Sequence, residues 1–257
     1  MKKFLGIFLL FFITTTSAFS AEMRFVQVDG ALYNNASNTQ FEKLIEKINA
    51  EKNIKFVVFT GNNISKSNDE ILKSFLKKAK KLKSPYYVVL GQKDVYKQKG
   101  LSKEEYVKIL NKKAKAHRRI KSPNYVFTKN KVVFIVADGS KEFMPSPIGY
   151  YRENVLLWLD EQLDKYEDKN VVILQHYPII PPAKKETYYT YKADEYLQLL
   201  SEHKNVKAVI SGHFNVNNEQ MKDGILHIST QNAPAYRVID ILDYETENPQ
   251  FWSVIKD

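Results

Sequence analysis

Short apolar runs alternate with helical patterns through the first third of the chain, and this order strongly limits the possible folds. The runs at 25–28, 54–59 and 86–90 are rich in Val, Phe and Tyr, which is typical of buried strands. Between them, apolar residues recur at helical spacing in 41–48 and 71–82. Parallel strands need a crossover connection, usually a helix, so this β-α-β-α-β order predicts a parallel sheet with crossover helices.

The rest of the chain continues this alternation and changes character after Phe214. We expect, in chain order, a charged helix at 103–116, strands at 125–127 and 132–136 joined by a turn, an amphipathic helix at 151–166, a strand at 170–174, a helix at 191–202, a strand at 206–210, and antiparallel strands at 224–229, 235–243 and 250–254. No repeat or linker interrupts the pattern. We therefore predict one α/β domain, residues 21–257, with two sheets packed face to face and helices outside.

The first twenty residues differ from the rest. Lys2 and Lys3 precede an apolar run at 4–13, which is too short to span a bilayer comfortably, and small and polar residues follow. This pattern predicts a signal peptide over 1–20, cleaved near Ser20-Ala21, and export to a periplasmic or extracellular location. The alternative is an uncleaved N-terminal anchor. The chain has no Cys, so it has neither a lipobox nor disulfides.

The chain is strongly basic, with a formal net charge of +10. Only five of its 39 basic residues are Arg, the side chain that usually reads bases and phosphates, so we expect no specific nucleic-acid partner. Most lysines fall on the polar faces of expected helices, which indicates a solvated surface. Attraction to an anionic surface, such as a membrane or a wall polymer, is the alternative. The pattern indicates no oligomeric state.

Glycine or a potential ligand follows each of five expected strands. The segments are Asp29-Gly30-Ala31, Thr60-Gly61-Asn62-Asn63, Gly91-Gln92-Lys93-Asp94, Gln175-His176-Tyr177-Pro178 and Ser211-Gly212-His213-Phe214-Asn215. In open α/β sheets, ligands bind at the carboxyl ends of the strands. These five segments therefore define the expected functional site.

This order resembles that of the calcineurin-like metallophosphoesterases, which place D-x-H, G-D, G-N-H-[DE], a lone His and G-H-x-H at five successive strand ends. The resemblance covers nearly the whole chain after the first twenty residues. Within the family, the chain is similar to the secreted acid-phosphatase-like members. It implies a four-layer α-β-β-α sandwich of two mixed sheets. It also implies hydrolysis of phosphate mono- or diesters by two cations about 3.5–4 Å apart.

Four residues match the functional positions that the resemblance implies. Asp29 matches the first Asp, an oxygen ligand to the first metal, and Asp94 keeps the acidic end of the third motif. His176 matches the lone His ligand, and His213 matches the first His of G-H-x-H. Structural roles are the alternative: a turn held by Asp29, and buried, hydrogen-bonded histidines.

Five positions depart from the family pattern. Ala31 replaces a His, Asn62 replaces the bridging Asp, Gln92 replaces an Asn ligand, Lys93 replaces a His and Asn215 replaces the last His. Alanine ligates nothing, and a neutral amide is a poor bridge between two cations. We expect no stable binuclear centre. A single weakly bound Mn, Fe or Zn ion at the His176/His213 end, with weak help from the Asn62 and Gln92 side chains, or no ion, is the expected outcome.

Several other residues are candidates for the pocket. Asn63, Asn215 and His227 are expected to line it. Asp138 and Glu142 are candidates for replacement metal ligands, since they follow the strand at 132–136.

Lys93 is the least conventional of the expected functional residues. It either stabilises an oxyanion, replaces the charge of a missing metal, or pairs with Asp94. Together with Asp94 and His176 it forms the expected catalytic set.

Two functional hypotheses follow. The first is an exported, divergent metallophosphoesterase with weak or no activity. The alternative is a pseudoenzyme that binds a phosphorylated small molecule or a partner protein through Lys93, His176, His213 and the Tyr-rich segment 188–191. A third possibility, a Lys-rich module that docks on anionic polymers, needs no chemistry in the cleft.

Overall fold

The computed structural model describes residues 23–34, 38–113, 119–185 and 187–257, so the expected signal peptide lies outside the described residues. The strands are β1 (Met23–Val28), β2 (Ile54–Phe59), β3 (Tyr86–Val88), β4 (Tyr125–Lys129), β5 (Val132–Val136), β6 (Gly149–Tyr150), β7 (Val171–Leu174), β8 (Thr190–Tyr191), β9 (Val206–Ser211), β10 (Asn218–Lys222), β11 (Ile225–Ser229), β12 (Tyr236–Leu242) and β13 (Gln250–Lys256). The helices are α1 (Asn38–Ala50), α2 (Asp69–Ala79), α3 (Lys103–Lys113), α4 (Glu153–Lys165) and α5 (Ala193–Ser201).

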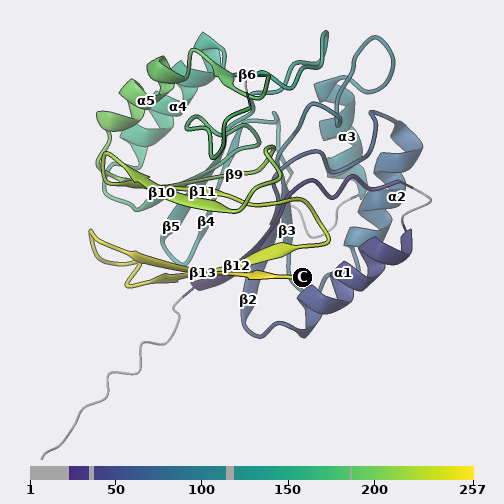
Figure 1. Ribbon diagram of the computed structural model, residues 1–257, viewed down its shortest axis with the longest axis horizontal. Helices are drawn as coiled ribbons and strands as arrows, with labels where there is room; N and C mark the ends of the chain where they lie inside the picture. The colour runs from purple at the N-terminus through teal and green to yellow at the C-terminus, as the bar shows by residue number, and fades with distance from the viewer. Residues whose placement is uncertain (1–22, 35–37, 114–118, 186) are drawn as a thin grey trace, which may run out of the picture.

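Two mixed sheets form the middle of the molecule. The first has the strand order β13-β12-β1-β2-β3, and the second has the order β10-β11-β9-β7-β5-β4. Figure 1 shows α1 and α2 beside the first sheet and α4 and α5 beside the second. The predicted α-β-β-α architecture, with two mixed sheets and outer helices, is confirmed.

Aromatic side chains fill the space between the sheets. Phe25 of β1 stacks on Phe56 of β2, with ring centroids 4.7 Å apart. Phe134 of β5 meets Phe56 edge-on at 4.9 Å, and Phe127 of β4 meets it edge-on at 5.4 Å. All four side chains are buried, so alternate residues of each strand point into this shared core.

Helix α2 illustrates how the local sequence fixes an outer layer. The Asn68 side chain caps its first turn by accepting a hydrogen bond from the Ile71 backbone N–H at 3.0 Å. Asp69 and Glu70 favour its N-terminus, and Lys77 and Lys78 favour its C-terminus. Its apolar face packs on the first sheet, where Phe75 meets Phe59 of β2 edge-on at 5.2 Å.

The structure corrects the expectation for the end of the second sheet. The segment 224–229 was expected to be antiparallel, but β11 pairs in parallel with β9, placing Ile228 beside Ile210. The antiparallel partner of β11 is β10, whose sequence NEQMK lies at the exposed sheet edge and has no apolar alternation to reveal it. The connection through β10 returns the chain so that β11 runs in the direction of β9. Strands β12 and β13 are antiparallel, as expected.

Smaller elements also differ from expectation. Helix α3 ends at Lys113 in the described part of the chain. The two-residue strands β6 and β8 were not expected and form a separate parallel pair. Within the described residues, no helix has both the length and the apolar character needed to cross a bilayer.

Candidate functional site

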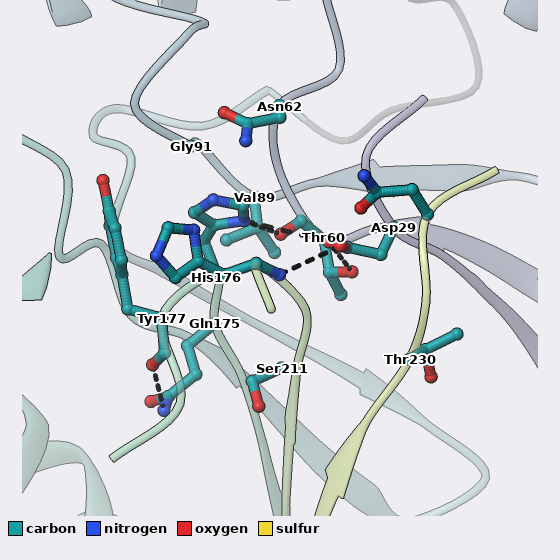
Figure 2. Close-up of polar contacts among 12 residues, drawn as sticks. Asp29, Thr60, Asn62, Val89, Gly91, Gln175, His176, Tyr177, Ser211 and Thr230 are labelled. Carbon is teal, nitrogen blue, oxygen red and sulfur yellow. Dashed lines mark hydrogen bonds and ion pairs between the residues drawn. The ribbon is translucent and has the colours of Figure 1, made fainter. Parts of the chain in front are cut away.

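The carboxyl ends of strands from both sheets converge at one edge of the sandwich. Asp29 follows β1, Thr60 follows β2, His176 lies two residues after β7, and His213 lies two residues after β9. Figure 2 shows Asp29, Thr60 and His176 gathered at this point, with Asn62 and Gly91 on neighbouring loops. The fold therefore brings together residues that are up to 184 positions apart in the sequence, such as Asp29 and His213.

Asp29 is fully buried, and protein groups donate to both of its carboxylate oxygens. Oδ1 accepts a hydrogen bond from the Thr60 hydroxyl at 3.0 Å, and Oδ2 accepts one from the backbone N–H of His213 at 2.9 Å. Burial raises the pKa of this carboxyl to about 8. Gly212 permits the close approach, because a Cβ at that position would lie 1.7 Å from Oδ1.

A chain of buried hydrogen bonds leads to Asp29 from the space between the sheets. The Arg237 Nε–H donates to the Thr230 hydroxyl at 2.9 Å, and that hydroxyl donates to Gln27 at 2.6 Å. The Gln27 amide then donates to the Thr60 hydroxyl at 3.2 Å, and Thr60 donates to Asp29. Each donor in this series points toward Asp29, so the hydrogen bonds together fix the orientation of its carboxyl group. Figure 2 includes Thr230.

His176 is buried beside Asp29, and its tautomer is set by the backbone. Nδ1 lies 2.8 Å from the carbonyl oxygen of Thr60. Because a carbonyl only accepts, Nδ1 carries the proton and Nε2 keeps its lone pair. Nε2 lies 2.8 Å from Gln92 Oε1, and it accepts a hydrogen bond from this side chain once the amide is turned so that its NH₂ faces the ring. Burial lowers the pKa of His176 well below its usual value, so the ring is neutral.

His213 has the same arrangement, with its two nitrogens exchanged. Nε2 lies 2.8 Å from the carbonyl oxygen of Pro147 and therefore carries the proton. Nδ1 is buried and has no hydrogen-bond partner among the described residues. Burial lowers the pKa of His213 to about 4. The ring centroid lies 4.9 Å from that of His176, and Tyr188 stacks on its other side at 4.6 Å.

The two histidines have the hydrogen-bond arrangement that is usual for metal ligands. A metal-bound histidine usually donates its other N–H to a carbonyl or carboxylate, and His176 and His213 both do so. The Nδ1 of His213 has no partner among the described residues, whereas a cation at Nε2 of His176 would have to displace the Gln92 amide or take its oxygen as a further ligand. Ala31 offers no ligand atom, and each Asp29 oxygen accepts one hydrogen bond. The Asn62 side-chain oxygen accepts from the Lys93 backbone N–H at 3.0 Å.

Asp94 is a buried tie between two loops. Its carboxylate accepts hydrogen bonds from the Asn63 amide at 2.9 Å, the Ile64 N–H at 3.1 Å and the Gly91 N–H at 2.8 Å. Burial raises the pKa of Asp94 to about 7. Lys93 is exposed and forms no ion pair with Asp94 in the described part of the structure. Asp94 and Asn63 thus hold the loops after β2 and β3 together.

A sequence comparison identifies the family. A sequence model of the calcineurin-like phosphoesterases matches residues 34–217. The chain belongs to the calcineurin-like phosphoesterase family. No curated protein matches it.

Solved structures share this fold at low sequence identity. A dimetal phosphatase from Danio rerio is 14% identical, with a TM-score of 0.70 over 90% of this chain and 99% of that one. Purple acid phosphatase PPD1 from yellow lupin is 12% identical, with a TM-score of 0.61 over 91% of this chain and 53% of that one. GAP50 of Plasmodium, described as the anchor in the inner membrane complex, is 13% identical, with a TM-score of 0.57 over 91% and 89%. These similarities show the fold alone.

The two candidates for replacement ligands bind a lysine instead. The Asp138 carboxylate lies 2.6 Å from the Lys103 ammonium, and the Glu142 carboxylate accepts from the Lys103 backbone N–H at 2.7 Å. Ser140 donates to the other oxygen of Asp138. Both acids therefore secure the start of α3, and neither supplies this phosphoesterase-family cleft with a ligand.

Asn215 lies at the edge of the site. It is exposed, and its side-chain oxygen accepts from the Asn232 backbone N–H at 2.8 Å.

His227 requires a correction. It was expected to line the pocket, but it is in register with Val209, which belongs to the core beneath α4 and α5. Side chains alternate along a strand, so His227 points to the outer face of the second sheet.

Burial of His227 predicts a pH effect that is separate from the cleft. Burial lowers its pKa to about 4, below the usual value of 6.5, so the folded state resists protonation. Its contribution to stability is complete above pH 6.5 and is lost as the pH falls toward 4. At pH 5.0 the cost is about 2 kcal/mol. We expect His227→Leu to lose less stability than the parent between pH 7.5 and pH 5.0 in urea unfolding. Equal losses in the two proteins would contradict this assignment.

The sequence interpretation also missed a polar cluster on the outer helices. His203, which follows α5, has a side chain that is 11% exposed, and its Nε2 lies 2.7 Å from Asp160 of α4. Asp164 lies one helical turn further along, and the three side chains offer ligand atoms within 4.8 Å of one another. The i, i+4 spacing of the two aspartates was the available signal. The cluster lies on the α4–α5 side, away from the cleft.

Proposed function

We propose that this chain is an exported member of the calcineurin-like phosphoesterase family whose cleft does not assemble a binuclear metal centre and has weak or no hydrolytic activity. The main support is the set of side chains at the strand ends, where Asp29 is the carboxylate that remains among the expected metal ligands, Ala31 offers no ligand atom and Asn62 offers only a neutral amide. A two-metal mechanism needs anionic ligands that bring two cations close together. The basic start and apolar run of the first twenty residues support export.

The cleft would hold at most one divalent cation. His176 and His213 each keep one nitrogen lone pair, because backbone carbonyls bind their N–H groups. Imidazole ligands suit zinc and iron, and the added Gln92 oxygen is compatible with manganese. A bound ion would supply Lewis-acid chemistry. Two strong ligands and one amide form a weak site, so we expect incomplete occupancy.

A second candidate function is the binding of a phosphorylated small molecule or a partner protein without turnover. Lys93 is exposed beside Gln92, and the Lys185 ammonium donates to the Phe214 carbonyl at 2.7 Å, next to His213. Two ammonium groups thus flank a cleft that has few anionic ligands, which favours an anionic guest. GAP50, whose fold this chain shares, is described as an anchor.

Metal content tests the proposal directly. We expect the purified protein to hold no more than one equivalent after loading with manganese, iron and zinc, as measured by elemental mass spectrometry. His213→Ala should remove this ion. His227→Leu is the matched control, because this histidine points to the outer face of the second sheet and its replacement should leave the metal content unchanged. The measurement is repeated in His203→Ala, which removes the histidine of the α4–α5 cluster, and two equivalents in that variant would overturn the proposal.

Phosphoesterase assays and ligand binding distinguish the two candidate functions. A weak enzyme should hydrolyse p-nitrophenyl phosphate or its diester and lose that activity in His213→Ala or with a chelator. A binding protein should retain affinity for a phosphorylated ligand in the chelator and lose it in Lys93→Ala.

A further inference from the structure

Large apolar side chains are exposed along one rim of the cleft. The rim comprises residues 141–150 and 188–191. Phe143 is 54% exposed and Met144 is 77% exposed, while Tyr189 and Tyr191 are 43% and 49% exposed. Removing these apolar side chains from water lowers the free energy, so an exposed apolar patch of this kind marks an interaction site.

The rim is one continuous structure that lies over the site. Strands β6 and β8 pair within it, and the Gly149 N–H donates to the Tyr189 carbonyl at 3.0 Å. Pro147 accepts the hydrogen bond of His213, and Tyr188 stacks on the same ring. Figure 1 shows β6 at the opposite end of the molecule from β12 and β13. Because Pro147 and Tyr188 of the rim both contact His213, a partner bound to the rim lies beside the cleft.

Lysines lie beside the aromatic rings of this rim. The Lys97 ammonium lies 5.0 Å from the ring centroid of Phe143, and that of Lys141 lies 6.0 Å from Tyr150. The Lys185 ammonium lies 5.1 Å from the ring of Tyr188. Glu142, the acid within the rim, binds the backbone of Lys103. The rim therefore combines apolar groups with positive charge and complements an anionic partner.

We propose that this rim docks onto an anionic lipid surface. Aromatic side chains favour the boundary between lipid headgroups and acyl chains, and lysines favour anionic headgroups. Phe143 and Met144 would enter this boundary, with Lys97, Lys141 and Lys185 at headgroup level. A nucleic-acid strand fits less well, because Met144, the most exposed rim residue, has no ring on which a base could stack. Docking needs no hydrolysis and no metal ion, so it is independent of the proposed function.

A single label can report insertion because the chain has no Cys. Met144→Cys, carrying a polarity-sensitive fluorophore, should shift to the blue with vesicles of phosphatidylcholine and phosphatidylglycerol, and much less with phosphatidylcholine alone. Met221→Cys is the matched control. Met221 is 64% exposed but lies on the β10 edge, beside Leu226 of β11, and should show no shift. Both variants share the same N-terminal segment, so any contribution from that segment is common to them. Chelator is present throughout.

Charge removal provides the second readout. Lys141→Ala and Lys185→Ala should each weaken binding to the anionic vesicles about fivefold, as expected for about 1 kcal/mol per lysine near the surface. Lys204→Ala, on the far side after α5, should leave binding unchanged. An equal shift of the label at position 221 would overturn the proposal. So would equal binding of the rim-lysine and Lys204 variants, or the same shift of the Met144→Cys label with a single-stranded oligonucleotide or inorganic polyphosphate.

Discussion

Restoring the family residues at the five departing positions should give the chain two-metal phosphoesterase activity, at least about 100-fold above that of the parent. The changes are Ala31→His, Asn62→Asp, Gln92→Asn, Lys93→His and Asn215→His. The reason is electrostatic, because the restored groups add an anionic bridge between the ions and remove an ammonium that repels them. Initial rates on p-nitrophenyl phosphate and its diester measure the gain, and metal content should rise toward two equivalents.

The same five changes combined with Asp29→Ala form the control. This protein should lose the first metal and return to the activity of the parent, because no other carboxylate in the described structure lies where Asp29 does. Two bound equivalents without activity would show that ligand loss is not what limits hydrolysis. Failure to bind metal in the five-residue variant would show that the loops after β1 and β2 have closed the site, as the hydrogen bonds to Asp29 permit.

Asp94→Ala should lower the free energy of unfolding by about 4 kcal/mol, the largest stability effect that we expect from the site. The change leaves the Asn63 amide, the Ile64 N–H and the Gly91 N–H without their acceptor in a buried region. Each unsatisfied buried donor costs about 1–3 kcal/mol, and partial relaxation reduces the sum. Urea unfolding at pH 7 measures the loss.

Two further variants frame this measurement. Asp94→Asn keeps the shape and one acceptor oxygen, so it should lose less, about 2 kcal/mol. Asp168→Ala removes an exposed acid that pairs with Lys169 at 2.6 Å and should leave the urea midpoint close to that of the parent. If Asp94→Ala unfolds at the same urea concentration as Asp168→Ala, the carboxylate is not the tie between these loops.

The fold could be predicted from sequence because its signals are local. Apolar runs such as 54–59 and helical spacing such as that of Ile71 and Phe75 report burial on one side of an element. Strand β10 was not predicted because it lies at an exposed edge of the sheet, where burial does not select apolar side chains. The parallel pairing of β11 with β9 was not predicted for a related reason. The burial pattern of a strand does not indicate the direction of its neighbour.

The candidate site was only partly predictable. The position of a side chain after a strand indicated Asp29, His176 and His213, and the departures at Ala31 and Asn62 were visible in the sequence. The sheet face on which His227 lies and the partners of Asp138 and Glu142 could not be predicted from the sequence. A side chain with hydrogen-bonding capacity has the same identity whether it faces a cleft, a helix layer or a lysine, and only its neighbours in space decide which.

The sequence by itself determined the order of the main strands and helices, the strand ends that form the site, and the departures from the family pattern at five positions. These properties depend on residue identity and on contacts within a few positions along the chain. Only the tertiary structure decided which nitrogen of each histidine carries the proton, because that choice depends on the Thr60 and Pro147 carbonyls. It also decided that Asp29 is already bonded on both oxygens. Backbone groups are the same at every residue, so their partners are fixed only when distant segments meet.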